Sequence, residues 1–293
     1  MLIDNVVLYD RAHSFELNNP MHPLYYAFDY DERSYQINME FQHYHRHYEI
    51  CVFLDDSAGH IIDGDWFDIK CADIVLLRPL LLHKTQYPQG APNKRLIINF
   101  NFPIAIPGLE ESYKHLLALF DASTPIYRFE GPEKKIIFSK LNMIYDLTKS
   151  SNVLSPLMIH QKFQEFLSLI YLNQSKNVYK KKSLLTTSLA KIYNITSFIH
   201  NNYNEQLSLS HISKKFFISD YYLSHQFKKV TGFTLTEYIQ ITRIQMVQFL
   251  LMTTDQDITD IAFQCGFSSF SQFNRVFRKH SNMSPSAFRK QNK

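Results

Sequence analysis

A stretch near the C-terminal end of this 293-residue chain occurs twice, and the repeat constrains the fold more than any other feature. At a spacing of 50 residues, the segment Phe227-Lys228-Lys229 with its following Gly232 and Tyr238 recurs as Phe277-Arg278-Lys279 with Asn282 and Phe288. Further upstream, Leu209 and Ile212 match Ile258 and Ile261 at a spacing of 49, so the second copy holds one extra residue between them. A repeat sustained in this way predicts one supersecondary unit used twice.

Each copy has the local signals of a helix, a turn and a second helix. The second helices are expected to begin near Ser219 and Ser269, and to end at Gly232 and Asn282, which tolerate positive φ. Gly266 fits a left-handed stop in the second turn. The helices that follow open with the capping box Thr234-(x2)-Glu237 and with Ser284-Pro285. The chain from about Leu235 to Leu251 is apolar on most sides, which predicts a buried helix between two helix-turn-helix units.

One face of each second helix is polar or basic. Arg and Asn suit two-pronged contacts to guanine and adenine edges, and Lys or Arg near a helix end suits phosphates. For either copy alone, such a polar face could simply be exposed to solvent. Because a polar or basic face occurs in both copies, DNA binding is favoured. We expect the second copy, with Asn274, Arg275 and Arg278, to contribute more sequence specificity than the first. The residues expected at the DNA are Ser219, Tyr221, Tyr222, Ser224, His225, Lys228, Lys229, Ser269, Ser271, Gln272, Asn274, Arg275, Arg278 and Lys279.

The charge of the chain is distributed unevenly along the sequence. From Leu184 to Lys293 there are 12 Lys and Arg against 6 Asp and Glu, a net charge of +6, whereas Met1 to Ser183 carries 19 against 21. This asymmetry is expected when one part of a protein faces a polyanion and the other does not.

The C-terminal third of the chain resembles a known family. The segment ITDIAFQCGFSSFSQFNRVFRKHSNMSPSAFR (258–289) resembles the signature of AraC-family transcriptional regulators, and LSLSHISKKFFISDYYLSHQFKKVTGFTLTEYIQITRIQMV resembles that family's first helix-turn-helix and connecting helix. The chain departs mildly from the family at Ser213 and Val247, where Ala is usual, and at Asn282, where Gly is usual. The resemblance implies that the exposed positions named above contact bases and phosphates.

The N-terminal part has a different pattern. Short apolar runs from about Ile37 to Phe102, with Asp63-Gly64 as a hairpin turn, predict an antiparallel barrel or jelly roll. Helical spacing follows over residues 109–120, 132–148 and 156–173, the last with Ser155 as N-cap and Pro156 as first helical residue. The fold class is therefore α+β and multidomain: a cupin-like antiparallel β-barrel with following helices, then an all-α domain of two helix-turn-helix units joined by a long helix. The expected divisions are 1–108 for the barrel, 109–178 for a helical dimerisation segment, 179–187 for a polar linker and 188–293 for the DNA-binding domain.

A cluster of potential ligands lies in the predicted barrel. His43, His45, His47 and Glu49 point to one side of an extended chain, and His83 follows a later strand. The set resembles the metal-binding motifs of cupins, although the motif glycines are absent. Our first expectation is a small-molecule pocket formed by His43, His45, Glu49 and His83, with an aromatic side chain such as Tyr35 or Trp66; a sugar would suit such a pocket. The alternatives are a divalent metal held by His43, His45, Glu49 and His83, or a structural role only.

These features together predict a transcription regulator that is controlled by a small-molecule effector such as a carbohydrate, and not an enzyme. Its expected partners are double-stranded DNA, the effector, a second copy of the chain and, for an activator, RNA polymerase; no cofactor is required and no membrane is involved. Three scattered cysteines and the absence of a signal-like N-terminus favour the cytoplasm. Two alternatives remain open: a metal-dependent cupin enzyme fused to a DNA-binding domain, and an effector-independent regulator whose barrel only dimerises.

Overall fold

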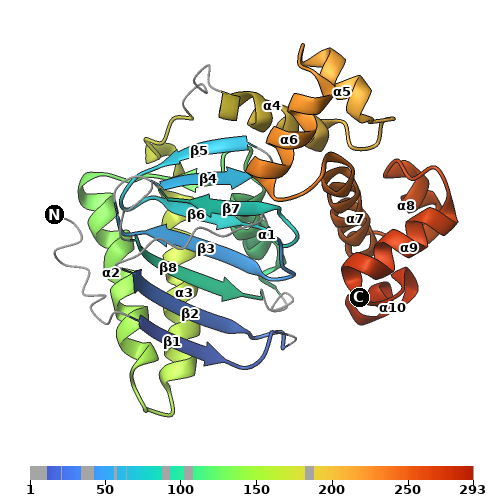
Figure 1. Ribbon diagram of the computed structural model, residues 1–293. Helices are drawn as coiled ribbons and strands as arrows, with labels where there is room; N and C mark the ends of the chain where they lie inside the picture. The colour runs from blue at the N-terminus through green and yellow to red at the C-terminus, as the bar shows by residue number, and fades with distance from the viewer. Residues whose placement is uncertain are drawn as a thin grey trace.

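The computed structural model describes residues 12–20, 22–33, 43–55, 58–63, 65–87, 93–101, 108–181 and 188–292. The chain forms a sheet domain (residues 12–181) and a helical domain (residues 188–292), with the helical domain at one edge of the sheets (Figure 1). Within the described ranges, no helix is both long and apolar enough to cross a membrane.

The sheet domain consists of two antiparallel sheets. The larger sheet has the order β1-β2-β8-β3-β6-β9 and the smaller one has the order β5-β4-β7. Ile62 lies opposite Asp65, so the chain reverses direction where the hairpin was predicted, although Gly64 of that turn lies outside the described residues. The strands are β1 (Ala12–Leu17), β2 (Tyr26–Arg33), β3 (Tyr48–Phe53), β4 (Ala58–Ile62), β5 (Asp65–Ile69), β6 (Ile74–Leu77), β7 (His83–Gln86), β8 (Asn93–Phe100) and β9 (Ile126–Tyr127).

Alternation along the strands gives the larger sheet two apolar faces, because successive side chains point to opposite sides. Cys51, Phe53 and Val75 face the smaller sheet and form one buried cluster with Phe67 and Ile69 of β5. The neighbouring positions, such as Ile50 and Ile74, point the other way into a second cluster. The two sheets therefore pack as a sandwich, and the outer apolar face of the larger sheet must be covered by other elements.

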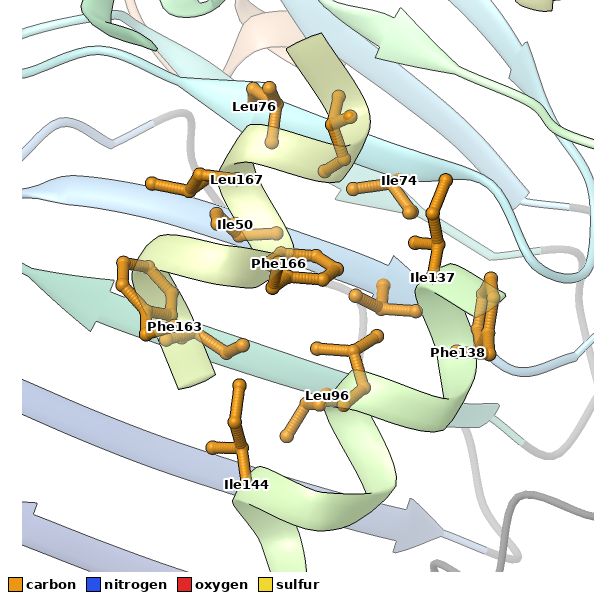
Figure 2. Close-up of a cluster of buried hydrophobic side chains, with 14 of the residues drawn as sticks. Ile50, Ile74, Leu76, Leu96, Ile137, Phe138, Ile144, Phe163, Phe166 and Leu167 are labelled. Carbon is orange, nitrogen blue, oxygen red and sulfur yellow. The ribbon is translucent and has the colours of Figure 1, made fainter. Parts of the chain in front are cut away.

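Helices α2 (Gly131–Thr148) and α3 (Ser155–Leu172) provide this cover (Figure 1). Figure 2 shows their side chains, among them Ile137 from α2 and Phe166 from α3, packed against Ile50, Ile74 and Leu96 of the sheet. Complete burial of Phe166 makes its truncation to alanine cost about 3–5 kcal/mol. The helix α1 (Glu110–Ala118) precedes this pair, so all three helices predicted between the barrel and the linker are present.

Several sequence-based expectations for the N-terminal half need correction. The strand-rich region begins earlier than Ile37, because β1 and β2 precede it, and β9 adds a strand inside the segment expected to be helical. The helix α3 begins at Ser155 itself and its N-cap residue is Leu154, so Ser155 is not the cap. The start of the expected linker is also part of the sheet domain, since Tyr179 is buried in the cluster between the sheets. Tyr35 lies outside the described residues.

The helical domain is built around two apolar clusters and one helix that joins them. The helix α7 (Leu235–Thr253) contributes Leu235 and Tyr238 to the first cluster and Ile244 and Val247 to the second, which confirms the predicted buried spacer. The other helices are α4 (Ser188–Asn201), α5 (Leu209–Lys215), α6 (Asp220–Thr231), α8 (Ile258–Gln264), α9 (Phe270–Ser281) and α10 (Pro285–Asn292).

Candidate nucleic-acid interface and the histidine cluster

The two predicted helix-turn-helix units are α5–α6 and α8–α9, and both second helices begin where the sequence places them. Ser219 caps α6 by accepting a hydrogen bond from the Tyr222 N–H at 3.2 Å, and Ser269 caps α9 by accepting from the Gln272 N–H at 3.2 Å. Both hydroxyls are exposed and keep their own hydrogen for an outside acceptor. The first backbone N–H groups of each helix point in the same direction, which favours an anion such as a phosphate there.

The ends of α6 and α9 are also equivalent. Gly232 (φ 84°) and Asn282 (φ 54°) both terminate their helices in the left-handed conformation, and their N–H groups donate to the carbonyls of Lys228 and Arg278. Asn is among the few non-glycine residues that tolerate this conformation. The departure at Asn282 therefore leaves the unit intact.

The turns between the helices differ by the one residue expected from the sequence: α5 and α6 are separated by residues 216–219, and α8 and α9 by residues 265–269. In the second turn Gly266 has φ 86°, and a Cβ atom there would lie 2.8 Å from the backbone oxygen of Asn204. In the first turn the matching residue is Phe217, which has φ 53° and is 92% exposed. An exposed aromatic residue in the left-handed conformation was not predicted here from the sequence. The alignment of Phe217 with Gly266 could have indicated it, because glycine often marks this conformation.

Ser213, the second departure from the family pattern, has a partner in the neighbouring helix. Its buried hydroxyl donates a hydrogen bond to the carboxylate of Asp220 in the first turn of α6. The matching residue in the second copy is Ala262, which is fully buried. The hydrogen bond to Asp220 therefore satisfies the buried hydroxyl of Ser213, which would be destabilising if it had no partner.

The candidate DNA face of α6 is open. Tyr221 is 82% exposed and its ring stacks beside that of His225 at a centroid distance of 6.3 Å, and Ser224 and Lys228 are exposed on the same helix. Tyr222 is half-buried. Lys229 is exposed beside Lys228 at the C-terminal end, where positive charge also complements the helix dipole.

The candidate DNA face of α9 is open at its basic residues and partly occupied elsewhere. Ser271, Arg275, Arg278 and Lys279 are exposed. Asn274 is half-buried, and its amide donates to the Phe270 carbonyl at 3.2 Å. Gln272 is half-buried too, and its side-chain oxygen accepts from Ser268. Arg275 and Arg278 are thus immediately available to a ligand, whereas Asn274 and Gln272 would first exchange a local hydrogen bond.

In the sheet domain, four of the predicted ligand residues come together and one does not. His43 and His83 are paired across an antiparallel bridge, with both backbone N–H···O distances at 3.0 Å and ring centroids 4.2 Å apart. The Glu49 carboxylate lies 2.8 Å from His45 Nε2 and 3.7 Å from His83 Nε2. Trp66 instead stacks on Tyr193 of the helical domain at 5.2 Å.

Burial sets the charge state of this histidine cluster (His43, His45, Glu49 and His83). Desolvation, aided by neighbouring His83, lowers the pKa of His43 to about 3, and burial lowers the pKa of His83 as well. Burial alone would raise the pKa of Glu49, but the imidazoles of His83 and His45 hold it well below the usual range. The cluster therefore combines an ionised carboxylate with the neutral rings of His43 and His83, groups that metal ions accept as ligands.

The cluster opens toward the helical domain. A cavity of about 410 Å³ is lined by His43, His45 and Arg46 on the sheet side and by Gln248 and His280 on the helical side. Around it the domains are in contact, because the Arg46 guanidinium lies 4.5 Å from the centre of the Phe288 ring of α10. Leu82, next to His83, is fully buried in the apolar cluster of the first helix-turn-helix unit.

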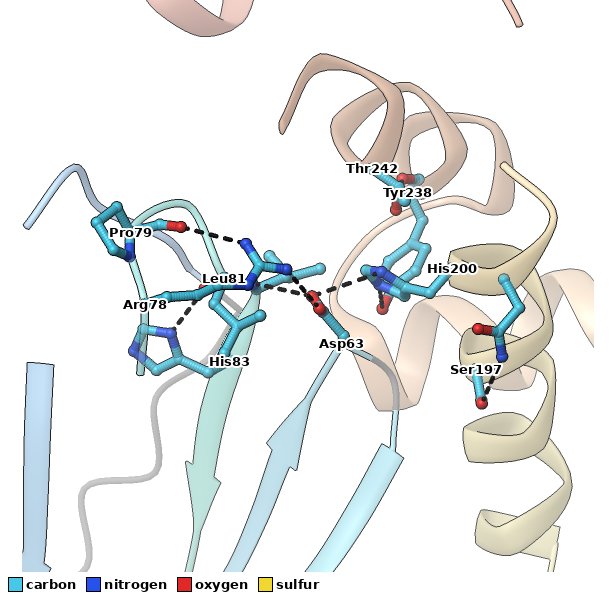
Figure 3. Close-up of polar contacts among 11 residues, drawn as sticks. Asp63, Arg78, Pro79, Leu81, His83, Ser197, His200, Tyr238 and Thr242 are labelled. Atoms are coloured by element: carbon cyan, nitrogen blue, oxygen red, sulfur yellow. Dashed lines mark hydrogen bonds and ion pairs between the residues drawn. The ribbon is translucent and has the colours of Figure 1, made fainter. Parts of the chain in front are cut away.

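A polar contact at the turn between β4 and β5 adds to this junction (Figure 3). The Asp63 carboxylate lies 3.5 Å from the Arg78 guanidinium and 3.5 Å from His200 Nδ1 of α4. His200 in turn shares a hydrogen bond of 3.1 Å with the Tyr238 hydroxyl of α7. The sheet domain is thereby linked to the helix that joins the two units.

The fold and the polar faces define a tandem helix-turn-helix domain, a class of DNA-binding module. Comparison with known proteins agrees: residues 212–291 match the family described as "Helix-turn-helix domain". Residues 212–291 of this chain therefore form a helix-turn-helix domain, as the sequence predicted.

The relatives are regulators of transcription. The chain is 28% identical over 157 residues to the uncharacterized HTH-type transcriptional regulator YdiP of Escherichia coli, which covers 54% of this chain and 51% of YdiP. It is 26% identical over 245 residues to the Msm operon regulatory protein of Streptococcus mutans, which covers 83% of this chain and 84% of that protein. Among solved structures, ToxT of Vibrio cholerae aligns with 91% of this chain and 98% of its own length, at 15% identity and a TM-score of 0.35. The match to YdiP thus spans about half of that relative's length.

Proposed function

We propose that the whole chain is a transcription regulator that binds specific double-stranded DNA through α6 and α9. The observation that carries the proposal is the equivalence of the two helices: each has an exposed polar face and a basic C-terminal end, and the single helix α7 fixes their relation. Two recognition helices about 34 Å apart can enter successive major grooves on one side of a duplex.

Within this proposal the exposed residues have separate tasks. Arg275 reads a base edge, because its guanidinium is free of close partners on α9 and can form the two-pronged contact to guanine. Lys228, Lys229, Arg278 and Lys279 at the helix ends neutralise phosphates, which gives affinity and salt dependence rather than sequence preference. Tyr221 and His225 of the first unit offer a stacked aromatic surface for sugar or base edges.

The sheet domain has two further tasks in the proposal. It senses an effector at the histidine cluster, and it pairs two copies of the chain through α2 and α3. The apolar side chains that these helices and their connection leave exposed support pairing, because such a surface is costly in water. They are Ile136, Met143, Val153, Leu154, Leu157 and Met158. A regulator of this kind works beside the chromosome, in the cytoplasm of a bacterial cell, and contacts RNA polymerase if it activates; we expect no enzymatic turnover.

The test begins with selection of genomic fragments by the purified chain, followed by affinity measurements on the recovered DNA. Arg275→Ala is expected to weaken specific binding by about 1–3 kcal/mol. Lys70→Ala is the matched control, because it also removes one exposed positive charge but lies directly after β5 in the sheet domain. Failure to recover any preferred sequence, or an Arg275→Ala affinity equal to that of Lys70→Ala, would contradict the proposal.

A further inference from the structure

The hydrogen bonds behind the histidine cluster fix which ring nitrogens face inward. His45 Nδ1 lies 2.9 Å from the His47 carbonyl, and His83 Nδ1 lies 2.9 Å from the Leu81 carbonyl. Because a carbonyl oxygen can only accept, both Nδ1 atoms must carry the hydrogen and donate it. His83 Nε2, which has no hydrogen-bond partner among the described residues, therefore presents a lone pair toward Glu49 at 3.7 Å. His45 Nε2 shares a hydrogen bond of 2.8 Å with the Glu49 carboxylate, and a metal ion bound between them would displace that proton. Backbone carbonyls hold metal-binding histidines in the same way.

Two nitrogens of the cluster are buried without a hydrogen-bond partner among the described residues: His43 Nδ1 and His83 Nε2. A buried polar atom of this kind is destabilising unless something binds it. Together with His45 Nε2 and the Glu49 carboxylate, these nitrogens make four potential metal ligands on one side of the cluster. Among them, His45 and Glu49 contact each other at 2.8 Å.

The spacing of the donors decides what can fit between them. One donor atom from each of His43, His45, Glu49 and His83 lies within 4.8 Å of all the others. Four donors at about 2.1 Å from a tetrahedral ion are separated by about 3.4 Å, so a small contraction of the cluster completes the site. The space among these four atoms suits a single ion, whereas an organic ligand would occupy the adjoining cavity of about 410 Å³.

The position of the cluster connects it to the DNA-binding units. His43, His45 and Arg46 share one short segment, and Arg46 reaches Phe288 of the second unit. His83 follows Leu82, which is part of the apolar cluster of the first unit. Both backbone segments that supply histidines to the cluster therefore also hold the helical domain.

We propose that His43, His45, Glu49 and His83 bind one divalent transition-metal ion of the Zn²⁺ type, and that this ion is the effector that changes DNA affinity. The second half rests on the proposed regulatory function, whereas the first does not. Three imidazoles and one carboxylate form a donor set for Zn²⁺ and neighbouring metals. By pulling the two segments together, the ion changes how the sheet domain holds both helix-turn-helix units, and thus favours one position of these units relative to the sheet domain.

The site is tested with the untagged full-length chain, stripped with a chelator and titrated with Zn²⁺. We expect one ion per chain and a rise in melting temperature, both lost in His45→Ala and in Glu49→Gln. His115→Ala is the control, because it removes an exposed histidine of α1. Since a substitution in the cluster could impair folding, Co²⁺ added to the unaltered chain gives an independent readout: a tetrahedral site produces intense visible absorption. The proposed metal site would be overturned if the unaltered chain showed neither stoichiometric Zn²⁺ binding nor the Co²⁺ absorption. It would also be overturned if Zn²⁺ binding persisted in both His45→Ala and Glu49→Gln.

The effector role is tested by measuring affinity for selected DNA with and without Zn²⁺. Coupling between two sites in a regulator is commonly fivefold or more, so we expect a change of at least about fivefold in the unaltered chain and none in folded His45→Ala. Stoichiometric metal binding with unchanged DNA affinity would overturn the effector role. A chain that binds Zn²⁺ but never binds DNA would contradict the proposed function and leave the metal site standing.

Discussion

The two helix-turn-helix units share one architecture but differ in what surrounds them. The first unit is packed against the sheet domain, since Leu82 is part of its apolar core, whereas the core of the second consists of helical-domain residues only. In Figure 1 α6 lies beside the sheets and α9 lies farther from them. The second unit also has the more basic open face, with Arg275 and Arg278. Duplication thus allows one copy to serve as the anchor to the sensing domain and the other as the main reader of DNA sequence.

The largest expected effect concerns the anchor. Leu82→Ala removes a fully buried side chain and should lower the free energy of unfolding by about 2–5 kcal/mol. Because Leu82 packs on the first unit, hydrogen exchange of the α6 amides should also become faster. Leu77→Ala is the control, since Leu77 is equally buried but lies between the two sheets. Equal protection of α6 in both variants would mean that the first unit is not anchored in this way.

The next effect concerns the difference in reading. Arg275→Ala should cost about 1–3 kcal/mol of specific DNA affinity, and His225→Ala in the first unit should cost less, because imidazole does not form the two-pronged contact of a guanidinium. Competition with unrelated DNA separates specific from nonspecific loss. A larger loss of specificity from His225→Ala would reverse the assignment of the reading unit.

A smaller effect concerns the turns. Phe217→Gly should stabilise the chain by about 0.5–1 kcal/mol, because it removes left-handed strain from an exposed side chain that contributes little packing. The matching change in the second unit, Gly266→Ala, should destabilise it, since the new Cβ would meet the Asn204 backbone. Denaturant titration of both variants measures the difference, and a destabilised Phe217→Gly would indicate that the aromatic ring has a role in the fold.

The smallest effect concerns the polar contact at the junction. Asp63→Asn weakens its contacts with Arg78 and His200, but these groups are partly exposed and 3.5 Å apart, so the expected loss is below about 1 kcal/mol. Thermal melting in low and high salt measures it. A loss well above this value would mean that the polar contact, and not Leu82, is the main anchor.

The sequence predicted the helical domain well because its signals are local. Ser219, Ser269, Gly232 and Asn282 each mark a helix end through their own backbone or side-chain chemistry, and the structure confirms these four boundaries. The buried helix between the units was equally visible from its apolar character.

The remaining features depend on contacts distant in sequence. Tyr179 looks polar beside its lysines, but it becomes buried because the chain returns to the sheet domain there. Trp66 was expected at the ligand pocket, and the structure places it against Tyr193, which lies more than a hundred residues away. The spacing of His43, His45 and Glu49 did predict their meeting with His83, yet their position at the junction could not be read from periodicity.

The central claim is that α6 and α9 bind one duplex together. Hydroxyl-radical footprinting of the unaltered chain on selected DNA tests this most directly. We predict, for each bound chain, two protected segments on one side of the duplex, about one helical turn of 10–10.5 base pairs apart, with only one of them lost in Arg275→Ala. A single protected segment per chain, or protection on opposite sides of the duplex, would contradict the account.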